Sequence, residues 1–440
     1  MPNPVDDSPV GPGEITLPSD SDPSVNATDP TPSGLRKFRR RALYVAAVCC
    51  TLVLVAFRDH PPTVGRPVDE LAYDAGNNLA DDPRLEPYQR PEDADYCVDL
   101  VSGPDHFSSA RFELPTSSDL LFFLSRGPVS GHISITKTPN YSTGPVEVNV
   151  TAQYHAHGNL QRTQVCQMGQ GRGVLLWAEP RHPHGDPKRN VRFNITVALP
   201  TGVKNYKDVT TDLPLFSHNV GDFFDIWSPT TFEVIRLKSS NAAIDFGSLI
   251  SQAAFIQNNN AEVKGFYGGL EVGVQTSNAR IDVTALMFGS HDGSESKVTL
   301  RTSNGEIKSL LGISSDFVNN TLRVTIQTSH APLIIDAPRL MADTRFFLDA
   351  ATSAAPTTVQ VAPEFEGVYD IQTSVAKAEV EVMDVKDPTG QGRHRTVVKE
   401  RTGRHAQGRA YWSGEGDQEE GVQRGFVKIS TSVSPVKLIL

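Results

Sequence analysis

Two pairs of histidines have the spacing of metal ligands on an extended chain. His155 and His157 are separated by one residue, as are His182 and His184. Because residues i and i+2 share one face of a β-strand, each pair could bind a metal ion. Metal sites in proteins need three or four ligands, however, and the sequence places no third ligand beside either pair. We therefore predict no metal site and no cofactor.

Ser290, His291 and Asp292 are the residue types of a nucleophilic catalytic triad. Triad side chains must converge in space, whereas the side chains of consecutive residues diverge. Gly289 and Gly293 flank the three residues, so the segment is predicted to be a loop without a catalytic role.

Three glycines at alternate positions, Gly169, Gly171 and Gly173, are reminiscent of a phosphate-binding loop. Such a loop leads into the N-terminus of a helix, whose backbone N–H groups bind the phosphate. The residues that follow, VLLWAE at 174–179, have the composition of a strand. We therefore predict no phosphate site at these glycines.

Asp245 and Asp282 occupy equivalent positions in two of the sequence repeats described below. If the two repeats were adjacent, the carboxylates could act as the acid/base pair of a glycoside hydrolase. The next repeat has Lys308 at this position, and 37 residues separate the first two repeats, which argues against direct adjacency. We expect exposed, solubilising charges here and predict no catalytic residue.

The composition excludes one large class of function. The chain has 440 residues and a formal net charge of −10. A protein that binds the phosphate backbone of nucleic acids needs clustered cations, so we expect no nucleic-acid partner. The length allows two or three domains.

The first 57 residues change composition abruptly. Residues 1–35 contain eight prolines, six acidic residues and no lysine or arginine, which predicts a disordered tail. Residues 36–57 begin with five basic residues and continue as an apolar run from Ala42 to Phe57. We expect this run to be an uncleaved transmembrane signal anchor, although it is short for a hydrocarbon core of about 30 Å.

The flanking charges predict the orientation of this anchor. Basic residues stay on the cytosolic side, so the N-terminus is expected in the cytosol and residues 58–440 in the lumen or outside the cell. This is the topology of a single-pass type II protein in the secretory pathway or plasma membrane. Residues 58–96 are rich in acidic residues and proline, which predicts a solvated stalk.

Two further features agree with a secretory location. Four glycosylation sequons, Asn140, Asn149, Asn194 and Asn319, follow the anchor, and a fifth, Asn26, lies in the predicted cytosolic tail and should stay bare. The only cysteines beyond the anchor are Cys97 and Cys166, and an isolated pair in an oxidising compartment is most simply a disulfide. We predict four glycosylated asparagines and one disulfide.

The segment 97–230 is predicted to be all-β. Short runs that alternate apolar and polar residues, such as HISIT at 132–136 and VRFNITVAL at 191–199, are separated by Pro, Gly and Asn. No long run has the 3.6-residue period of a helix. We expect an antiparallel, sandwich-like domain.

Residues 231–440 contain seven copies of a strand, a Thr-Ser or Ser-Ser pair, a short turn and a second strand. The second serine recurs in steps of 37, 26, 26, 24, 21 and 58 residues. These serines are Ser240, Ser277, Ser303, Ser329, Ser353, Ser374 and Ser432. Such a period predicts a stack of repeats that share one core. The alternating apolar residues predicted to face this core are Leu270, Val272, Val274, Ile281, Val298, Leu300, Leu322, Val324, Ile326, Val427, Ile429, Val436, Leu438 and Leu440.

The polar residues of the motif are expected to form corners between strands. Asn241, Asn278 and Asn304 follow the Thr/Ser pair, and asparagine tolerates the left-handed conformation of tight turns. Threonines in register can hydrogen-bond one another. Direct contact of these polar residues with a ligand is the alternative.

The clearest copy of the motif, Thr302 to Ile307 with the sequence TSNGEI, resembles an adhesin-like β-repeat family of unknown biochemical function. Members occur in bacterial envelopes and in membrane-anchored fungal proteins, and the closing segment RGFVKISTSVSPVKLIL is similar to the fungal branch. The resemblance covers residues 231–440. It implies a β-solenoid or β-roll-like stack and carries no catalytic residues.

Residues 386–424 interrupt the last repeats. The segment is basic and rich in glycine, and Tyr411 and Trp412 form an aromatic pair within it. A flexible insertion between paired strands is expected, and a partner-binding loop is the alternative.

These features predict a non-enzymatic membrane glycoprotein that presents a β-repeat ectodomain for adhesion or interaction. The expected partner is a cell-surface or wall glycan or a protein. A carbohydrate-active β-helix hydrolase and a purely structural surface scaffold are the alternatives. The hydrolase would need two carboxylates roughly 5–10 Å apart in a cleft.

Overall fold

The computed structural model of the chain describes residues 82–100, 106–154, 160–179, 191–224, 229–289, 294–314, 320–341, 344–401, 403–414 and 424–440. The predicted tail, the predicted anchor and residues 58–81 of the predicted stalk lie outside these ranges. In the described part of the chain, no helix has the length and apolar character that crossing a membrane would require.

The described residues form 26 strands that belong to one hydrogen-bonded network. The pairing of the strands divides this network into two layers, here called sheet 1 and sheet 2, which β12 (Ile244–Gln257) and β13 (Val263–Gln275) join. The second half of each of these two long strands belongs to sheet 1, and the first half belongs to sheet 2.

The other strands of sheet 1 are, in spatial order, β1 (Ala94–Val98), β6 (Thr163–Met168), β7 (Gly173–Ala178), β3 (Leu121–Arg126), β9 (Asn205–Asp212), β11 (Thr231–Lys238), then beyond β12 and β13, β15 (Ser296–Arg301), β17 (Thr321–Gln327), β19 (Arg345–Thr352), β25 (Gly425–Thr431), β21 (Gly367–Thr373), β24 (His405–Ser413) and β23 (His394–Arg401).

The other strands of sheet 2 are β2 (Phe107–Leu114), β5 (Val146–Gln153), β8 (Arg192–Leu199), β4 (Ser130–Lys137), β10 (Phe216–Asp222), then beyond β12 and β13, β14 (Ile281–Phe288), β16 (Ile307–Ser314), β18 (Leu333–Arg339), β20 (Thr357–Val361), β26 (Val436–Ile439) and β22 (Ala378–Glu381).

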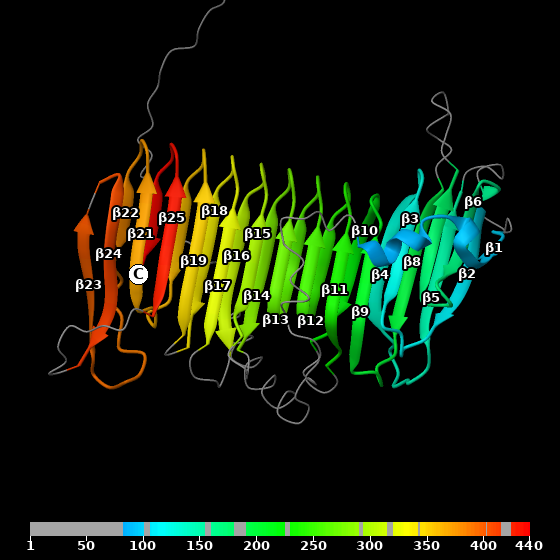
Figure 1. Cartoon of the computed structure of the whole chain (residues 1–440), viewed down its shortest axis with the longest axis horizontal. Coiled ribbons are helices and arrows are strands. Elements are labelled where there is room, and N and C mark those ends of the chain that lie inside the picture. Colours follow the sequence, from blue (N-terminus) through cyan, green and yellow to red (C-terminus); the bar gives the residue numbers. More distant parts are fainter. Residues whose placement is uncertain are drawn as a thin grey trace, which may run out of the picture. The chain divides into compact units, whose positions relative to one another are not determined.

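Each coil of the array consists of a strand in sheet 1, a short corner and a strand in sheet 2. Successive coils stack with their strands parallel, so that β15, β17 and β19 are neighbours in one layer and β16, β18 and β20 in the other. Figure 1 shows β15, β17 and β19 side by side. The stacked repeats predicted from the sequence are therefore present.

The predicted core residues lie between the two sheets. Apolar residues alternate with polar ones along each strand, and alternation in a strand places one set on the inner face. Val324 and Ile326 are fully buried, as are Val427 and Ile429 in the last coil. The same holds for the other predicted core residues except Leu270, which is half-buried.

The exception at Leu270 has a geometric cause. Strand β13 passes from sheet 2 to sheet 1 near this residue, so the alternation changes phase and Glu271 becomes buried instead. Lys297 lies 3.5 Å from the Glu271 carboxylate. Burial nevertheless raises the pKa of Glu271, because the charged form loses water.

The structure contains one coil that was not predicted from the sequence. Its corner consists of Asn258, Asn259 and Asn260 and connects β12 to β13. The backbone N–H of Ser277 donates to Asn259 O, and that of Asn260 donates to Ser240 O. The step of 37 residues between Ser240 and Ser277 therefore spans two coils, not one.

The spatial order of the last coils differs from their sequence order. Strand β25 lies between β19 and β21 (Figure 1). Strand β26 lies between β20 and β22. A similar intercalation occurs earlier in the chain, where β3 lies between β7 and β9.

The antiparallel sandwich predicted for residues 97–230 is wrong for most of this segment. Strands β3, β4 and β7–β10 have parallel neighbours, and the hydrogen bonds of β9 with β11 and of β10 with β12 continue past residue 230. Antiparallel pairs occur among β1, β6 and β7 and among β2, β5 and β8. Alternation of apolar and polar residues indicates that one face of a strand is buried. It does not indicate whether the neighbouring strand runs parallel or antiparallel, and so the strand direction was predicted wrongly.

The predicted solvated stalk also differs from the structure between residues 82 and 96. Two 3-10 helices, η1 (Pro83–Tyr88) and η2 (Pro91–Asp93), precede β1. Leu85 is buried, and the ring of Tyr88 stacks on that of Phe122 with centroids 4.8 Å apart. These apolar residues cover the outer face of sheet 1, which the acidic composition of the segment concealed.

The hairpin β23–β24 occupies the predicted insertion. Strand β24 pairs antiparallel with β21, and β23 pairs with β24. Trp412 is buried and donates its indole N–H to Pro363 O at 2.9 Å. The described residues of the insertion thus extend sheet 1.

Candidate functional site

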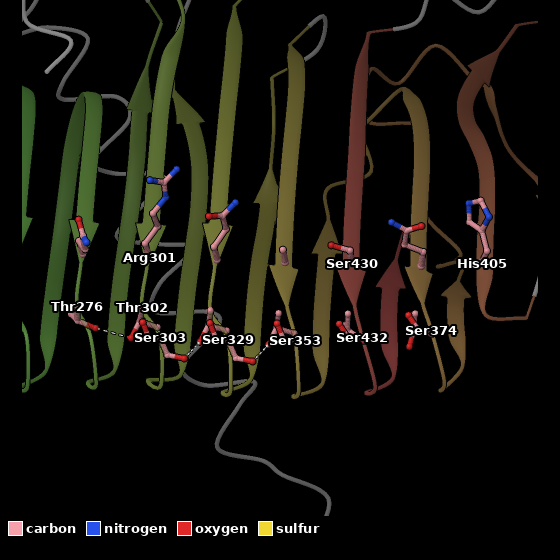
Figure 2. Close-up of a pocket in the computed structure, with 18 residues that line it drawn as sticks. Thr276, Arg301, Thr302, Ser303, Ser329, Ser353, Ser374, His405, Ser430 and Ser432 are labelled. Atoms are coloured by element: carbon pink, nitrogen blue, oxygen red, sulfur yellow. Dashed lines mark hydrogen bonds between the residues drawn. The ribbon is translucent and has the colours of Figure 1, made fainter. Parts of the chain in front are cut away.

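The corners of the coils form a continuous ladder of backbone hydrogen bonds. The N–H of Ser303 donates to Ser277 O at 3.1 Å, and that of Ser329 donates to Ser303 O at 3.0 Å. The ladder continues through Ser353 and Ser432. The serines of the motif consequently line up along one end of sheet 1 (Figure 2).

The threonines before these serines point into the array. The hydroxyl of Thr302 lies 2.9 Å from that of Thr276 and 3.3 Å from Ala279 O. Thr328 and Thr352 make equivalent contacts with carbonyl oxygens of the preceding corner. The hydrogen bond predicted between threonines is confirmed at Thr276 and Thr302, and buried hydroxyls at the other corners bind backbone carbonyls.

The asparagines of the corners form a side-chain ladder. The Asn304 amide donates to Asn278 Oδ1, the Asn278 amide to Asn260 Oδ1 and the Asn260 amide to Asn241 Oδ1, each at 2.7 Å. None of these residues has a positive φ, so the predicted left-handed conformation is wrong. Asparagine is used here because its amide both donates and accepts along the stack.

A groove on the outer face of sheet 1 follows these corners; we call it the corner groove. It has a volume of about 750 Å³, within the range of ligand-binding sites. It is lined by Gln275, Thr276, Arg301, Thr302, Ser303, Gln327, Thr328, Ser329, Ala351, Thr352, Ser353, Gln372, Thr373, Ser374, His405, Ser430, Thr431 and Ser432.

The floor of the corner groove is one row of register partners across seven strands. Every strand in this row is hydrogen-bonded on both sides. In spatial order the row is Gln275, Arg301, Gln327, Ala351, Ser430, Gln372 and His405. Figure 2 shows Arg301 and His405 toward opposite ends of the row of serines.

The glutamine and serine side chains of the corner groove are free to bind a ligand. The amides of Gln275, Gln327 and Gln372 have no hydrogen-bond partner among the described residues. The same is true of the hydroxyls of Ser303 and the other corner serines that line the groove. These groups offer a dense set of both donors and acceptors.

The ionisable side chains that line the corner groove are Arg301 and His405. The Nε2 atom of His405 lies 2.8 Å from the Asp370 carboxylate, which fixes the imidazole ring. No aspartate or glutamate lines this groove, and its aromatic residues are limited to that imidazole. The corner groove therefore lacks the carboxylate pair that glycoside hydrolysis needs.

The two aspartates considered as an acid/base pair are separated by the coil that the sequence analysis missed. Lys264 is the register partner of both Asp245 and Asp282. Its ammonium group lies 3.0 Å from Asp245 Oδ2, and this hydrogen bond raises the pKa of Lys264. Arg280 lies 2.7 Å from Asp282. The aspartates thus belong to a surface column of alternating charges.

Of the other motifs that resemble catalytic or ligand-binding sites, only the glycines at 169–173 lie in the described residues. Gly169 and Gly171 have positive φ angles and form the turn between β6 and β7, without a following helix. The two histidine pairs and the segment 290–292 lie outside the described residues. Within the described ranges, no group of three His, Cys, Asp or Glu side chains could hold a metal ion.

The predicted disulfide is confirmed. Cys97 and Cys166 are bonded, and their Cα atoms are 3.9 Å apart. They are direct register partners on β1 and β6, so the bond ties two adjacent strands at the edge of sheet 1.

Three of the four predicted glycosylation sites lie in the described residues and are exposed. Asn149 lies on β5 and Asn194 on β8, both on the outer face of sheet 2, and Asn140 follows β4. Asn319 lies outside the described residues.

Among known proteins, the chain is similar only to solved structures, and the sequence identity with them is low. No family model matches the chain, and no curated protein matches it. Solved structures similar to it include a provisionally named lipid-binding protein of Parabacteroides distasonis, with 10% identity, a TM-score of 0.35, and coverage of 60% of this chain and 93% of that chain. A provisionally named adhesin of Parabacteroides merdae has 11% identity and a TM-score of 0.28, with 60% and 92% of the two chains covered.

A provisionally named cell adhesion protein of Clostridium sporogenes is 8% identical, with a TM-score of 0.16, and the match covers 76% of this chain and 99% of that chain. These values assign neither a family nor a function to the chain. The resemblance to an adhesin-like repeat family and its fungal branch therefore stays a prediction.

The groove floor itself was not found in the sequence. Its glutamines lie one residue before the motif threonines in three copies, as in Gln275-Thr276, Gln327-Thr328 and Gln372-Thr373. This recurrence was the available signal. Only the parallel register shows that these amides meet Ala351 and Ser430 in one row.

Proposed function

We propose that the chain is a non-enzymatic, single-pass type II membrane glycoprotein that presents a β-solenoid for adhesion at the surface of the cell or within the secretory pathway. The apolar run 42–57 would anchor it, and residues 58–440 would be lumenal or extracellular. The observation that carries the proposal is the corner groove, whose glutamine amides and corner serine hydroxyls have no partner among the described residues and whose lining includes no carboxylate.

The distribution of the glycosylation sites supports the choice of binding face. Glycans on Asn149 and Asn194 would extend from the outer face of sheet 2. The corner groove opens on the outer face of sheet 1. A binding surface that glycans leave uncovered is what adhesion requires, since bulky sugars block close contact.

Cell adhesion tests this function directly. Cells that express the full chain should adhere to immobilised cell-surface glycans or to other cells more strongly than cells without it. Replacing Gln275, Gln327 and Gln372 by alanine together should reduce adhesion, whereas Gln153→Ala on the outer face of sheet 2 should not. Normal adhesion by cells that lack the chain would favour the alternative of a structural scaffold.

The membrane topology has its own test. In sealed microsomes, protease should remove the N-terminal tail and leave residues 58–440 intact. Peptide-N-glycosidase should increase the gel mobility of the full chain, and Asn149→Gln and Asn194→Gln should each remove one glycan. Digestion of the ectodomain in the absence of detergent would contradict the type II topology.

A further inference from the structure

We infer that the corner groove binds a linear, neutral polysaccharide that lies across the strands, an inference that rests on the proposed adhesive function. The direction follows from the register. From Gln275 to His405 the floor crosses six strand spacings, which is about 29 Å at roughly 4.8 Å each. A ligand that fills this length must be an extended chain.

The lining chemistry matches a ligand rich in hydroxyl groups. A sugar hydroxyl both donates and accepts a hydrogen bond, and so do the amides of Gln275, Gln327 and Gln372 and the serine hydroxyls along the corners. The corner serines recur in five consecutive coils, so their hydroxyls repeat at each strand spacing, and glutamine occupies three of the seven floor positions. A polymer of similar sugar units can use such a regular pattern along its length.

A peptide fits this groove poorly. Extended peptides bind by adding to a free strand edge or by placing side chains in apolar pockets. The strands beneath the corner groove are paired on both sides, and Ala351 is the only lining residue with a purely apolar side chain. Neither mode of peptide recognition is available.

The charge of the groove favours a neutral chain over an acidic one. Arg301 is the one permanently charged residue among the lining side chains. His405 faces Asp370 at 2.8 Å, and Lys428 on the adjacent strand lies in register between Asp349 and Asp370. An acidic polysaccharide would therefore meet a single arginine in the groove and the carboxylates of Asp349 and Asp370 nearby. Nucleic acid, with a charge on every nucleotide, would meet the same obstacle.

Binding of defined polysaccharides to the purified full chain in detergent tests the inference. The probes are linear neutral glucans and mannans, polygalacturonate, heparin, and oligosaccharides of increasing length from any polymer that binds. We expect binding to at least one neutral polymer, with affinity that increases with oligosaccharide length until the groove is filled.

Variants locate the site. Gln327→Ala with Gln372→Ala removes two amides and should weaken binding about tenfold. Ala351→Trp fills the middle of the groove and should abolish binding of long chains. Gln153→Ala is the matched control on sheet 2 and should leave the affinity unchanged. Thermal unfolding at the wild-type midpoint establishes that each variant is folded.

Each other outcome overturns the inference. Preference for polygalacturonate or heparin would contradict a neutral ligand, and unchanged binding by the groove variants would place the site elsewhere. If cells adhere through the chain but no polysaccharide binds, the inference fails and the adhesive function stands. If neither occurs, both fail.

Discussion

The backbone N–H of Ser432 donates a hydrogen bond to the carbonyl oxygen of Ser353 at 3.1 Å. The carbonyl of Ser432 in turn accepts from the N–H of Ser374 at 3.0 Å. The corner of the last coil in the sequence thus lies between two corners that precede it. Residues of β25 and β26 complete both sheets at this point, and the side chains of Val427 and Leu438 are fully buried there.

A cysteine pair can test this intercalation. Neighbouring strands are about 4.8 Å apart, within the range of a disulfide, whereas second neighbours are about 10 Å apart and beyond it. The variant S353C/S432C should form a disulfide on mild oxidation. The control S353C/S374C should not, because Ser432 separates its two cysteines. Peptide mapping under non-reducing conditions distinguishes the two, and a disulfide in the control alone would show that the coils stack in sequence order.

The inner and outer faces of β17 should respond differently to the same substitution. Val324 is fully buried, and Thr325 beside it is partly exposed on the outer face of sheet 1. Val324→Asn should destabilise the protein by about 3 kcal/mol or more, since it loses apolar burial and leaves an amide without partners. Thr325→Asn should change stability by less than about 1 kcal/mol. Equal shifts in the unfolding midpoints would contradict the face assignment.

Features set by local alternation could be predicted from the sequence. Val298 and Leu300 were assigned to the core because polar residues flank each of them, and both are fully buried. Cys97 and Cys166 were paired because no other cysteine competes beyond the predicted anchor. Such inferences need only the two-residue period or a residue count.

Features set by long-range pairing could not be predicted. The corner at Asn258–Asn260 lacks the Thr-Ser signature, although Asn259 accepts the same hydrogen bonds as a motif serine. Strand β25 lies between β19 and β21, which precede it in the sequence. This position depends on pairing with distant strands, and no local sequence pattern indicates which strands will pair. The corner groove depends on both, because its floor exists only in the final strand order.

Gly305 should be irreplaceable at its corner. A Cβ atom on this residue would lie 1.8 Å from Ala279 O and 2.2 Å from Ala279 C, both backbone atoms of the neighbouring corner. Since the ladder holds that backbone in place, Gly305→Ala should force the corners apart and destabilise the protein by several kcal/mol, by analogy with overpacking of a core. The control Gly312→Ala meets its nearest neighbour at an ordinary 3.4 Å and should be tolerated. Chemical denaturation of the two variants makes the comparison, and similar midpoints would show that the corner is free to move.

His218 should make the stability of the array sensitive to acid. The imidazole is buried, with Nδ1 3.1 Å from Phe216 O and Nε2 2.9 Å from the Thr211 hydroxyl. The neutral ring satisfies both contacts, because Nδ1 donates to the carbonyl and Nε2 accepts from the hydroxyl. Burial lowers the pKa of His218 to about 4; the bond to Phe216 opposes this change, and the neighbouring His132 contributes to it.

The sign of the effect follows from the two pKa values. Below the unfolded pKa of about 6.5 the unfolded chain binds a proton that the native ring does not, so stability is lost as the pH falls from about 6.5 to 4. The loss from this one group should be about 3 kcal/mol across that window. The wild-type free energy of unfolding should therefore decrease between pH 7 and pH 4 by about this amount more than that of His218→Gln. His330→Gln changes an exposed corner residue and should follow the wild-type curve. Parallel curves for the wild type and His218→Gln would show that the imidazole binds its proton at the same pH in the folded and the unfolded chain.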